Sequence, residues 1–505
     1  MDELRNDLPA ASHQLLSRPA RRALAACAVA GCLLTAAAVS CSIRRETGSP
    51  RADTTVTVSA GTDLGRFNNP AWYGNQTGPT SPLGPRDLRA VDALDVHLVR
   101  VWALPRGYYN ATTHRYDFDF AARDGSRAYR YLDQSARYAQ RLLVNLGECE
   151  PPIMTLSAPR RCRTVLRDGL LAYKKHYPSI RYVELFNEPD KGTDVPPGHW
   201  EGLTVEDYYH WYRIGYSVVN EVNRRLDPEI PLRLGGPATA TFNRSFLQGF
   251  LDRYASDRNP AKRLDFISYH QYKHGADPAS VATEKQTVRR WLSDRELDPN
   301  TPVFVTEYGI FPGDASATTL SADLLTQAAA MQTLAYYYVT SGMDIVMHWA
   351  YSHPSNPRKS MFVPDVDGAG YPYGNLVTMQ SMMKYTRVPA TSDRLSPNGI
   401  GVNALATVDG SGLAVLATNY QASRGGASHD VSLHVDDLPP QLAHRWLQVD
   451  RYLIDSTHSN YAHDPSSSTL EHVERRVLHG DDHVETGFRL ESNALTLVVI
   501  AAANG

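Results

Sequence analysis

The chain has 505 residues, more than one ordinary hydrophobic core holds, so we expect two folded units and a tail. Hydrophobic residues make up 42% and charged residues 21%, the proportions of a soluble globular protein. The net charge of -3 comes from 51 basic and 54 acidic residues. Because binding to nucleic acid needs a clustered basic face, we expect no nucleic-acid partner.

The first segment, residues 1–50, has the pattern of an export segment. Arginines before residue 23 precede a mostly apolar run of about twenty residues, as in an export signal or a single membrane anchor. The stretch 38–41 resembles a bacterial lipoprotein cleavage box, which makes Cys41 a candidate for lipidation. A cleaved signal and a retained anchor are the alternatives. In each case we expect a bacterial protein that works outside the cytoplasm, secreted or attached to the cell surface. A lipid or a retained anchor at this segment would attach it to the membrane.

Beyond that segment the chain contains two cysteines, Cys149 and Cys162. A lone pair that is close in sequence and in an oxidising compartment is more often a disulfide than a metal site. No group of His and Cys residues has zinc-binding spacing. The sequence therefore predicts one disulfide, no metal and no cofactor.

Residues 51–388 alternate short apolar runs with longer amphipathic stretches. We predict strands at 96–102, 141–146, 182–186, 232–235, 266–270, 303–306 and 345–349, with a first strand within 64–74. We predict helices at 87–94, 129–140, 163–176, 205–225, 245–254, 281–292, 322–340 and 376–385. Apolar strands that alternate with helices predict an α/β fold, a closed (β/α)8 TIM barrel. A doubly wound open sheet is the alternative, but no Gly-rich phosphate loop follows any strand.

Residues 389–505 lack the helical period. Strands are predicted at 401–407, 412–419, 431–435, 445–454, 483–490 and 494–501, joined by turns rich in Gly, Asp, Pro and Ser. We therefore predict a C-terminal all-β accessory domain, a sandwich. The extended stretch 54–60 has strand composition and is expected to pair with this domain.

Two predicted barrel strands end in a glutamate, Glu188 after the fourth strand and Glu307 after the seventh. Catalytic groups of a parallel barrel lie where its strands end, so both carboxyl groups should face one cleft. Two carboxyl groups across a cleft suit glycoside cleavage. Strand-end glutamates also serve as helix caps or ion-pair partners, but two of them three strands apart in a barrel pattern favour catalysis.

These motifs resemble a known group of enzymes. Asn187-Glu188-Pro189 on strand four, with Thr306-Glu307-Tyr308 on strand seven, is similar to clan A of the retaining glycoside hydrolases. The sequence Ser268-Tyr269-His270-Gln271-Tyr272 and the β-domain stretch 452–461 narrow the resemblance to family 39, which holds β-xylosidases and α-L-iduronidases. The resemblance implies a hydrolase that acts on an oligosaccharide or polysaccharide, β-xylosidase-like or a related exo-glycosidase.

The resemblance also implies residue roles. Glu307 would be the nucleophile, and Glu188 the general acid and base. Asn187 would bind the sugar 2-hydroxyl, Tyr272 would donate a hydrogen bond to Glu307, and His270 would lie beside Glu188. If the mechanism is retaining, the carboxyl oxygens should lie roughly 5 Å apart, and activity should have a bell-shaped pH dependence.

Three further residues are candidates for substrate binding. Arg100 could supply positive charge near Glu307, or it could form a structural ion pair in the barrel. Trp349 could stack on the sugar, or it could simply pack in the core. Trp102 stands where the family usually has a histidine, which replaces a polar sugar contact with an apolar one. Glu184 is expected to be a buried structural acid.

Two other functions fit the same sequence. The enzyme could be an endo-acting hydrolase or a transglycosylase on a cell-surface polysaccharide, with the same two glutamates. It could also be a surface carbohydrate-binding protein without catalytic activity.

Overall fold

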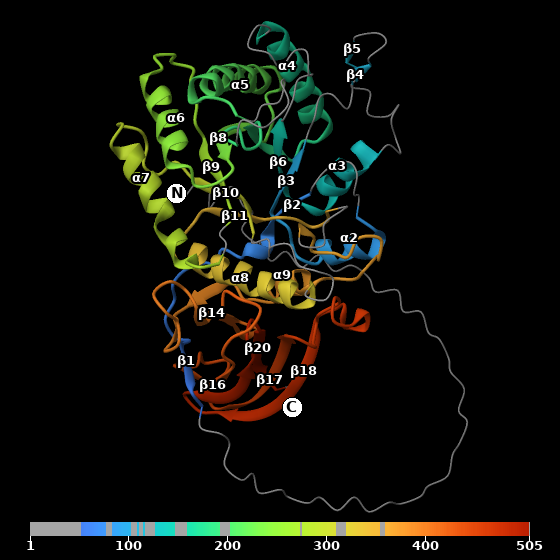
Figure 1. The fold of residues 1–505 in the computed structure, drawn as a ribbon, viewed down its shortest axis with the longest axis vertical. Helices are drawn as coiled ribbons and strands as arrows, with labels where there is room; N and C mark the ends of the chain where they lie inside the picture. Colours follow the sequence, from blue (N-terminus) through green and yellow to red (C-terminus); the bar gives the residue numbers. More distant parts are fainter. Residues whose placement is uncertain are drawn as a thin grey trace, which may run out of the picture. The chain divides into compact units, whose positions relative to one another are not determined.

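The computed structural model describes residues 52–76, 83–102, 109–110, 115–116, 127–146, 159–191, 202–272, 275–309, 320–353 and 359–503 (Figure 1). Cys41 and Cys149 lie outside these ranges, so lipidation and the disulfide stay predictions. Among the helices in these ranges, none has both the length and the apolar character needed to cross a membrane.

Eight parallel strands close into a barrel in the order β10-β11-β2-β3-β6-β7-β8-β9. Their bounds are β2 Tyr73–Asn75, β3 Leu98–Trp102, β6 Arg141–Leu146, β7 Ile180–Leu185, β8 Arg233–Thr239, β9 Phe266–Gln271, β10 Val303–Tyr308 and β11 Ile345–His348. Nearly every residue of these strands is buried, because one face points into the barrel and the other meets the helices. The predicted barrel is confirmed. Its first strand begins only at Tyr73, at the very end of the predicted window.

The helices that follow these strands lie outside the barrel (Figure 1). Their bounds are α2 Pro85–Asp92, α3 Arg127–Tyr138, α4 Pro159–His176, α5 Val205–Leu226, α6 Arg244–Ser256, α7 Glu284–Ser293, α8 Leu320–Thr340 and α9 Pro372–Ser381, with short 3-10 turns at Pro70–Trp72, Pro278–Thr283 and Pro465–Ser467. Helix α5 begins where the Thr204 hydroxyl accepts a hydrogen bond from the backbone N–H of Asp207 at 3.1 Å. Two residues each of β4 (Tyr109–Asn110) and β5 (Arg115–Tyr116) form a small separate pair.

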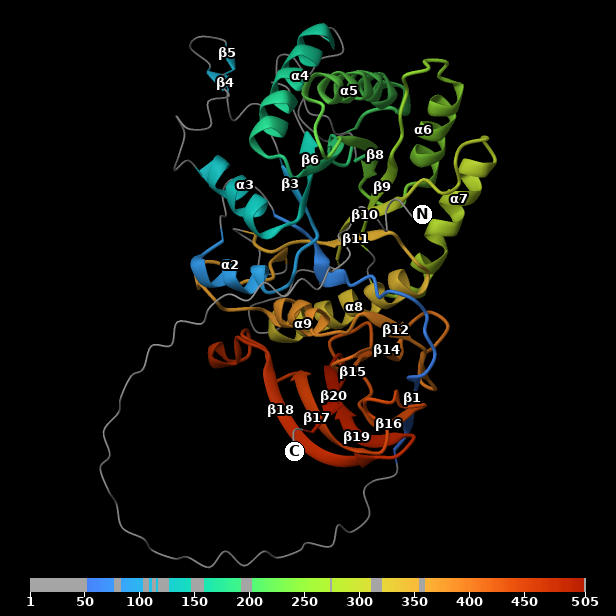
Figure 2. The ribbon, with the colours of Figure 1, turned by 180° about the vertical axis from the view of Figure 1, so that it is seen from behind.

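The C-terminal strands form two sheets with a hydrophobic core between them (Figure 2). One sheet has the order β13-β1-β16-β19 and the other β12-β14-β15-β20-β17-β18. The bounds are β1 Thr54–Ser59, β12 Thr386–Val388, β13 Ala390–Ser392, β14 Gly401–Asp409, β15 Gly412–Tyr420, β16 His429–Asp436, β17 Arg445–Ile454, β18 Glu471–Gly480, β19 Val484–Leu490 and β20 Leu495–Ala502. The stretch 54–60 does pair with this domain, since β1 lies parallel to β16.

Three strands of the β domain were not expected from the sequence. Strands β12 and β13 are three residues long, too short for any periodicity. Strand β18 lies at the edge of its sheet and pairs only with β17 among the described strands. It is rich in charged residues and only its last residue is buried, because charged side chains on an edge strand prevent pairing with other chains.

Barrel helices and β-domain strands share one hydrophobic core. The cluster that holds Leu334 of α8 also contains Leu416 of β15 and Leu497 of β20. Polar contacts add to it, because the Asn403 side-chain amide donates to the Thr333 hydroxyl at 3.1 Å. Helix α8 is therefore buried on nearly all sides, and its sequence is accordingly apolar along its whole length.

Candidate active site

The end of strand β7 turns sharply so that neighbouring side chains reach the same cavity. In a regular strand Glu184 and Asn187 would point to opposite faces, because they are three residues apart. Phe186 lies between them with φ 65°, in the left-handed region that non-glycine residues seldom adopt. Glu188 follows with φ 50°. This turn brings Asn187 onto the side of Glu184, and strained backbone of this kind is frequent at functional sites.

Arg100, at the end of β3, links three acidic or polar side chains. Its guanidinium donates to Glu184 Oε2 at 2.7 Å, to Glu307 Oε1 at 2.6 Å and to Asn187 Oδ1 at 2.9 Å. Both Arg100 and Glu184 are completely buried. Burial opposes the charged form of Glu184, but the Arg100 charge, the hydrogen bonds from Ser268 and Arg100 and the His270 charge together lower the pKa of Glu184. Glu184 is thus the structural acid predicted, and Arg100 contacts both the structural and the catalytic candidate.

Glu307, at the end of β10, is fixed through both of its oxygens. Arg100 donates to Oε1, and the Tyr272 hydroxyl donates to Oε2 at 2.5 Å. Burial raises the pKa of Tyr272 well above its ordinary value, so the phenol keeps its proton and remains a donor. Two donors hold the Glu307 carboxylate in one orientation, which a nucleophile needs.

Glu188 contacts two groups that can carry positive charge. His270 Nδ1 lies 3.0 Å from its Oε1, and Lys191 Nζ donates to its Oε2 at 2.6 Å. Burial alone would raise the pKa of Glu188, but the hydrogen bonds and charges of His270 and Lys191 lower it from 4.5 to about 2. In the unliganded protein Glu188 is therefore a carboxylate over nearly the whole pH range.

The two glutamates lie close together at the mouth of the barrel. One carboxyl oxygen of Glu188, one of Glu307 and a ring nitrogen of His270 all lie within 4.8 Å of one another. A separation of roughly 5 Å is that of retaining glycoside hydrolases, and inverting enzymes need a wider gap. The same three groups could in principle ligate a cation. Arg100 and Lys191 already place positive charge against these carboxylates, which disfavours a metal ion there.

The sequence model of glycosyl hydrolases family 39 matches residues 163–353, the range that contains Glu188, His270 and Glu307. The chain is a glycoside hydrolase that is similar to family 39 over this range. Among curated proteins, no sequence matches it.

Solved structures share the fold of the hydrolase at low sequence identity. A glucosidase from Croceicoccus marinus is 18% identical with a TM-score of 0.68, over 89% of this chain and 99% of that one. The family 39 enzyme from Xanthomonas axonopodis pv. citri is 15% identical with a TM-score of 0.66, over 91% and 100%. A monomeric β-xylosidase from Caulobacter crescentus is 15% identical with a TM-score of 0.64, over 89% and 100%. These structures bear out the barrel with its β domain.

The two tryptophan candidates of the hydrolase lie at strand ends of the same barrel. The Arg100 guanidinium carbon lies 5.3 Å from the centre of the Trp102 ring, within the range of a cation–π contact. Trp349 directly follows β11, and its backbone N–H donates to the Tyr308 carbonyl at 3.1 Å. Both side chains are partly exposed, which leaves ring surface for a ligand. Their roles in sugar binding stay predictions.

Lys191 is the site residue that the sequence analysis missed. Lys191 follows Glu188 by three residues, and this spacing is the only feature of the sequence that could have indicated a contact between the two side chains.

Asp190, the residue before Lys191, holds two loops together. Its carboxylate accepts hydrogen bonds from the Ala240 backbone N–H at 2.8 Å and the Asn243 side-chain amide at 2.7 Å. Asp190 thereby ties the loop after β7 to the loop after β8.

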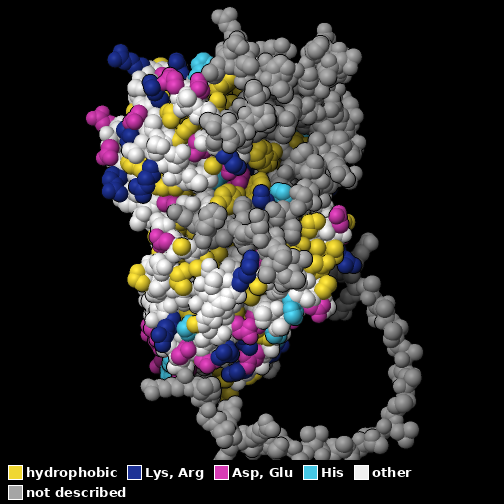
Figure 3. All heavy atoms as spheres, in the orientation of Figure 1, with side chains coloured by type: hydrophobic (Ala, Val, Ile, Leu, Met, Phe, Trp, Pro, Cys, Tyr) yellow, Lys and Arg dark blue, Asp and Glu magenta, His cyan; other side chains and the backbone are white. Residues whose placement is uncertain are grey.

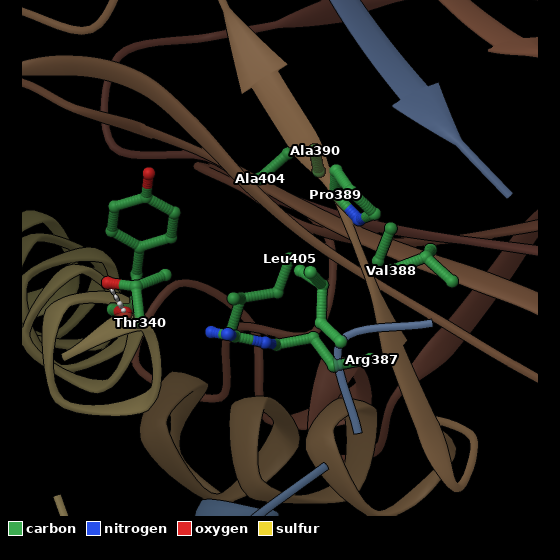
Figure 4. Close-up of a pocket in the computed structure, with 10 residues that line it drawn as sticks. Thr340, Arg387, Val388, Pro389, Ala390, Ala404 and Leu405 are labelled. Carbon is green, nitrogen blue, oxygen red and sulfur yellow. Dashed lines mark hydrogen bonds between the residues drawn. The ribbon is translucent and has the colours of Figure 1, made fainter. Parts of the chain in front are cut away.

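A further pocket lies away from this chemistry, between α8 and strands β12 to β14 (Figure 4). Its lining is mostly apolar, with Val388, Pro389 and Leu405 among the labelled residues. Arg387 extends from β12 towards α8 and donates to the Val339 carbonyl at 3.1 Å. No carboxylate lines this pocket, so it does not compete with the barrel mouth as an active site.

Proposed function

We propose that the hydrolase cleaves O-glycosidic bonds by double displacement with retention of configuration. The observation that carries the proposal is the pair of carboxylates, Glu188 and Glu307, with oxygens within 4.8 Å of each other. At that distance one carboxylate reaches the anomeric carbon while the other reaches the leaving oxygen.

In the first step a Glu307 oxygen forms a bond to the anomeric carbon, and the bond to the leaving oxygen breaks. Glu188 gives its proton to that oxygen. In the second step Glu188 takes a proton from water, the water oxygen bonds to the anomeric carbon, and Glu307 leaves. The carboxylate form of Glu188 found here suits the second step directly. The first step requires that Glu188 gain a proton.

The proposed substrate is a glycan from which a terminal sugar is removed, as by a β-xylosidase or a related exo-glycosidase. Asn187 would bind the 2-hydroxyl, and the hydrogen bond from Arg100 to its amide oxygen supports this role. Trp102 and Trp349 would contact the apolar faces of the sugar. Two structural neighbours are a glucosidase and a β-xylosidase, which supports action on a glycoside.

We further propose that the hydrolase works outside the cytoplasm, secreted or attached through its N-terminal segment. The basic and apolar pattern before residue 45 supports this. Mass spectrometry of the protein purified from its own membranes would distinguish a lipid on Cys41 from a cleaved signal. An intact N-terminus in the cytoplasmic fraction would contradict the proposal.

The first test is hydrolysis of a panel of aryl α- and β-glycosides: xylosides, arabinosides, glucosides, galactosides and uronides. The Glu307→Ala variant should lose turnover by about 10⁴-fold or more, because the nucleophile is removed. Added azide should restore turnover and give a glycosyl azide of inverted configuration, since azide occupies the space of the missing carboxylate.

The matched control is Glu229→Ala, which removes an exposed glutamate outside the site and should leave kcat/KM unchanged. An unchanged kcat in Glu307→Ala would contradict the assignment of the nucleophile. Turnover of the panel with inversion of configuration would contradict the double displacement.

A further inference from the structure

The pocket between α8 and strands β12 to β14 is a hollow of about 230 Å³ with a mostly apolar lining (Figure 4). Its floor consists of residues of β12 and β14 that are almost fully buried, among them Val388 and Leu405. Leu64 is 46% exposed and Thr340 is exposed as well, so these two residues form a rim in contact with solvent. A small molecule can therefore reach the buried floor from outside.

Arg387 brings a positive charge into this apolar lining. Among the described residues its guanidinium has one hydrogen-bond acceptor, the Val339 carbonyl at 3.1 Å, which leaves further N–H donors of the same group unused. No acidic residue lines the pocket, and no carboxylate of the described chain forms an ion pair with Arg387. Tyr336, the other titratable residue of the lining, is neutral, because burial raises the pKa of its phenol.

Burial makes the unpaired charge of Arg387 costly. It lowers the pKa of the guanidinium, as expected where no anion offsets the lost hydration. The group nevertheless stays charged, because arginine keeps its proton in proteins. Other partly buried cations of the chain do have anionic partners: Lys285 pairs with Asp344 at 2.6 Å, and Arg263 pairs with Asp265 at 2.7 Å. The pocket thus combines apolar walls with a cation that has no anion in the described part of the chain.

We propose that this pocket binds a small monocarboxylate whose body is a single apolar ring, with the carboxylate on Arg387 and the ring against the walls from β12 and β14. An apolar protein cavity of roughly 150 Å³ holds benzene, so the larger volume here has room for a ring and a carboxylate. The planar guanidinium can donate to both carboxylate oxygens. An inorganic anion would leave the apolar walls unused, and a neutral ring would leave the charge of Arg387 unpaired.

The attraction for this anion is local. On the face seen in Figure 3, basic and acidic side chains are interspersed over the described part, and the chain as a whole has a net charge of -3. The overall field of the protein therefore gives anions no general advantage. Preference for a carboxylate has to come from Arg387 itself, so a change of this one residue tests the proposal. The site lies away from the barrel mouth, and the inference does not depend on the proposed function.

The pocket has walls from a barrel helix and from the β domain, so it exists only in the folded protein. A ligand that binds the folded chain and not the unfolded chain raises the Tm as its concentration exceeds the Kd. Binding can therefore be followed in two ways, by a ligand-observed NMR titration and by the Tm. Neither readout needs a substrate or catalytic activity.

The test uses the full-length protein with benzoate, its neutral counterpart benzamide, and acetate, which has the charge without the ring. Benzoate should bind with a Kd of about 1 mM or tighter and raise the Tm. Benzamide and acetate should each bind about tenfold more weakly or less. Arg387→Met should weaken benzoate binding by about tenfold or more, the range of a charge-assisted hydrogen bond, and leave benzamide binding unchanged.

Leu64→Glu is a second variant, at an exposed position of the rim. It should also weaken benzoate binding, because the new carboxylate competes for Arg387, and it decides the question if Arg387→Met does not fold. Arg258→Met removes an exposed arginine after α6, and this matched control should bind benzoate as the wild type does.

Three results would overturn the proposal. The first is equal affinity for benzoate and benzamide in the wild type. The second is benzoate binding that is as tight in folded Arg387→Met and Leu64→Glu as in the wild type. The third is no binding of benzoate at about 10 mM, roughly tenfold above the expected Kd.

Discussion

The buried carboxylates of the site depend on ion pairs with neighbouring cations. Glu184, Glu188 and Glu307 bring three carboxyl groups to one barrel mouth, with Arg100 buried among them. A buried carboxylate is tolerated only when a cation and hydrogen bonds compensate for its lost hydration. Arg100 compensates Glu184 and Glu307, and Lys191 with His270 compensates Glu188. The resulting network lowers the pKa of Glu184 and of Glu188.

Because the pKa of Glu188 is low in the folded protein, the free energy of unfolding should depend on pH. Since the pKa falls from 4.5 in the unfolded chain to about 2 in the folded protein, Glu188 contributes stability that is fully present above pH 4.5. That contribution is lost as the pH falls from 4.5 towards 2. Between pH 6 and pH 3 the free energy of unfolding should therefore drop by about 2 kcal/mol more in the wild type than in Glu188→Gln.

Urea denaturation of both proteins at the two pH values measures this difference. Equal drops would show that the Glu188 carboxyl group has the same pKa in the folded and unfolded states. Glu229→Gln is the control, and it should lose stability with pH as the wild type does, because this residue is exposed.

At the scale of elements, the motif 452–461 is a connection between domains. After β17, Asp455 accepts hydrogen bonds from the backbone N–H groups of Thr457 and His458, at 2.8 and 2.7 Å. The turn that results presents Asn460, whose amide donates to the Ser321 hydroxyl of α8 at 3.0 Å. The Ser459 carbonyl accepts from the side chain of Asn375 in α9 at 2.9 Å. The residues that narrowed the family resemblance therefore join the β domain to two barrel helices.

Asn460→Ala should lower the free energy of unfolding by about 1–2 kcal/mol, because a fully buried amide loses its bonds to Ser321 and to the Asp455 carbonyl. Turnover per folded molecule should stay the same. Chemical denaturation and active-site titration measure the two quantities. Asn300→Ala removes an exposed side chain and should change neither. A loss of kcat in Asn460→Ala without a loss of stability would contradict a purely structural role.

For the whole molecule, the shared core has a thermodynamic consequence. Helix α8 buries apolar side chains against the barrel and against strands β15 and β20 in a single cluster. Removal of the β domain would expose the apolar side chains of α8 that now pack against β15 and β20, and exposed apolar patches favour aggregation. The barrel and the β domain are thus expected to fold as one unit.

Calorimetry should show one unfolding transition for residues 52–505, with calorimetric and van't Hoff enthalpies that agree. A fragment of residues 60–385 should aggregate, although it contains every residue of the proposed active site. Two separate transitions, or a soluble and active fragment, would show that the domains are independent.

The sequence alone determined the barrel, the β domain and the place of the two glutamates. Buried parallel strands are continuous apolar runs, and the ends of such strands meet at one edge, so Glu188 and Glu307 could be located without coordinates. Strands β12, β13 and β18 could not be found in this way, and β2 could be placed only within the window 64–74, because three residues show no period and a charged edge strand has no apolar face.

Only the tertiary structure decided which charges meet. From the sequence, Arg100 could either supply positive charge near Glu307 or form a structural ion pair in the barrel. In the folded protein it does both, because its guanidinium forms ion pairs with Glu184 and Glu307 at the same time. Lys191 had no pattern that set it apart from other lysines. Its importance comes from the left-handed turn at the end of β7, which puts its ammonium 2.6 Å from Glu188. Periodicity reports burial, but the protonation of a carboxyl group depends on neighbours that the chain brings together only when it folds.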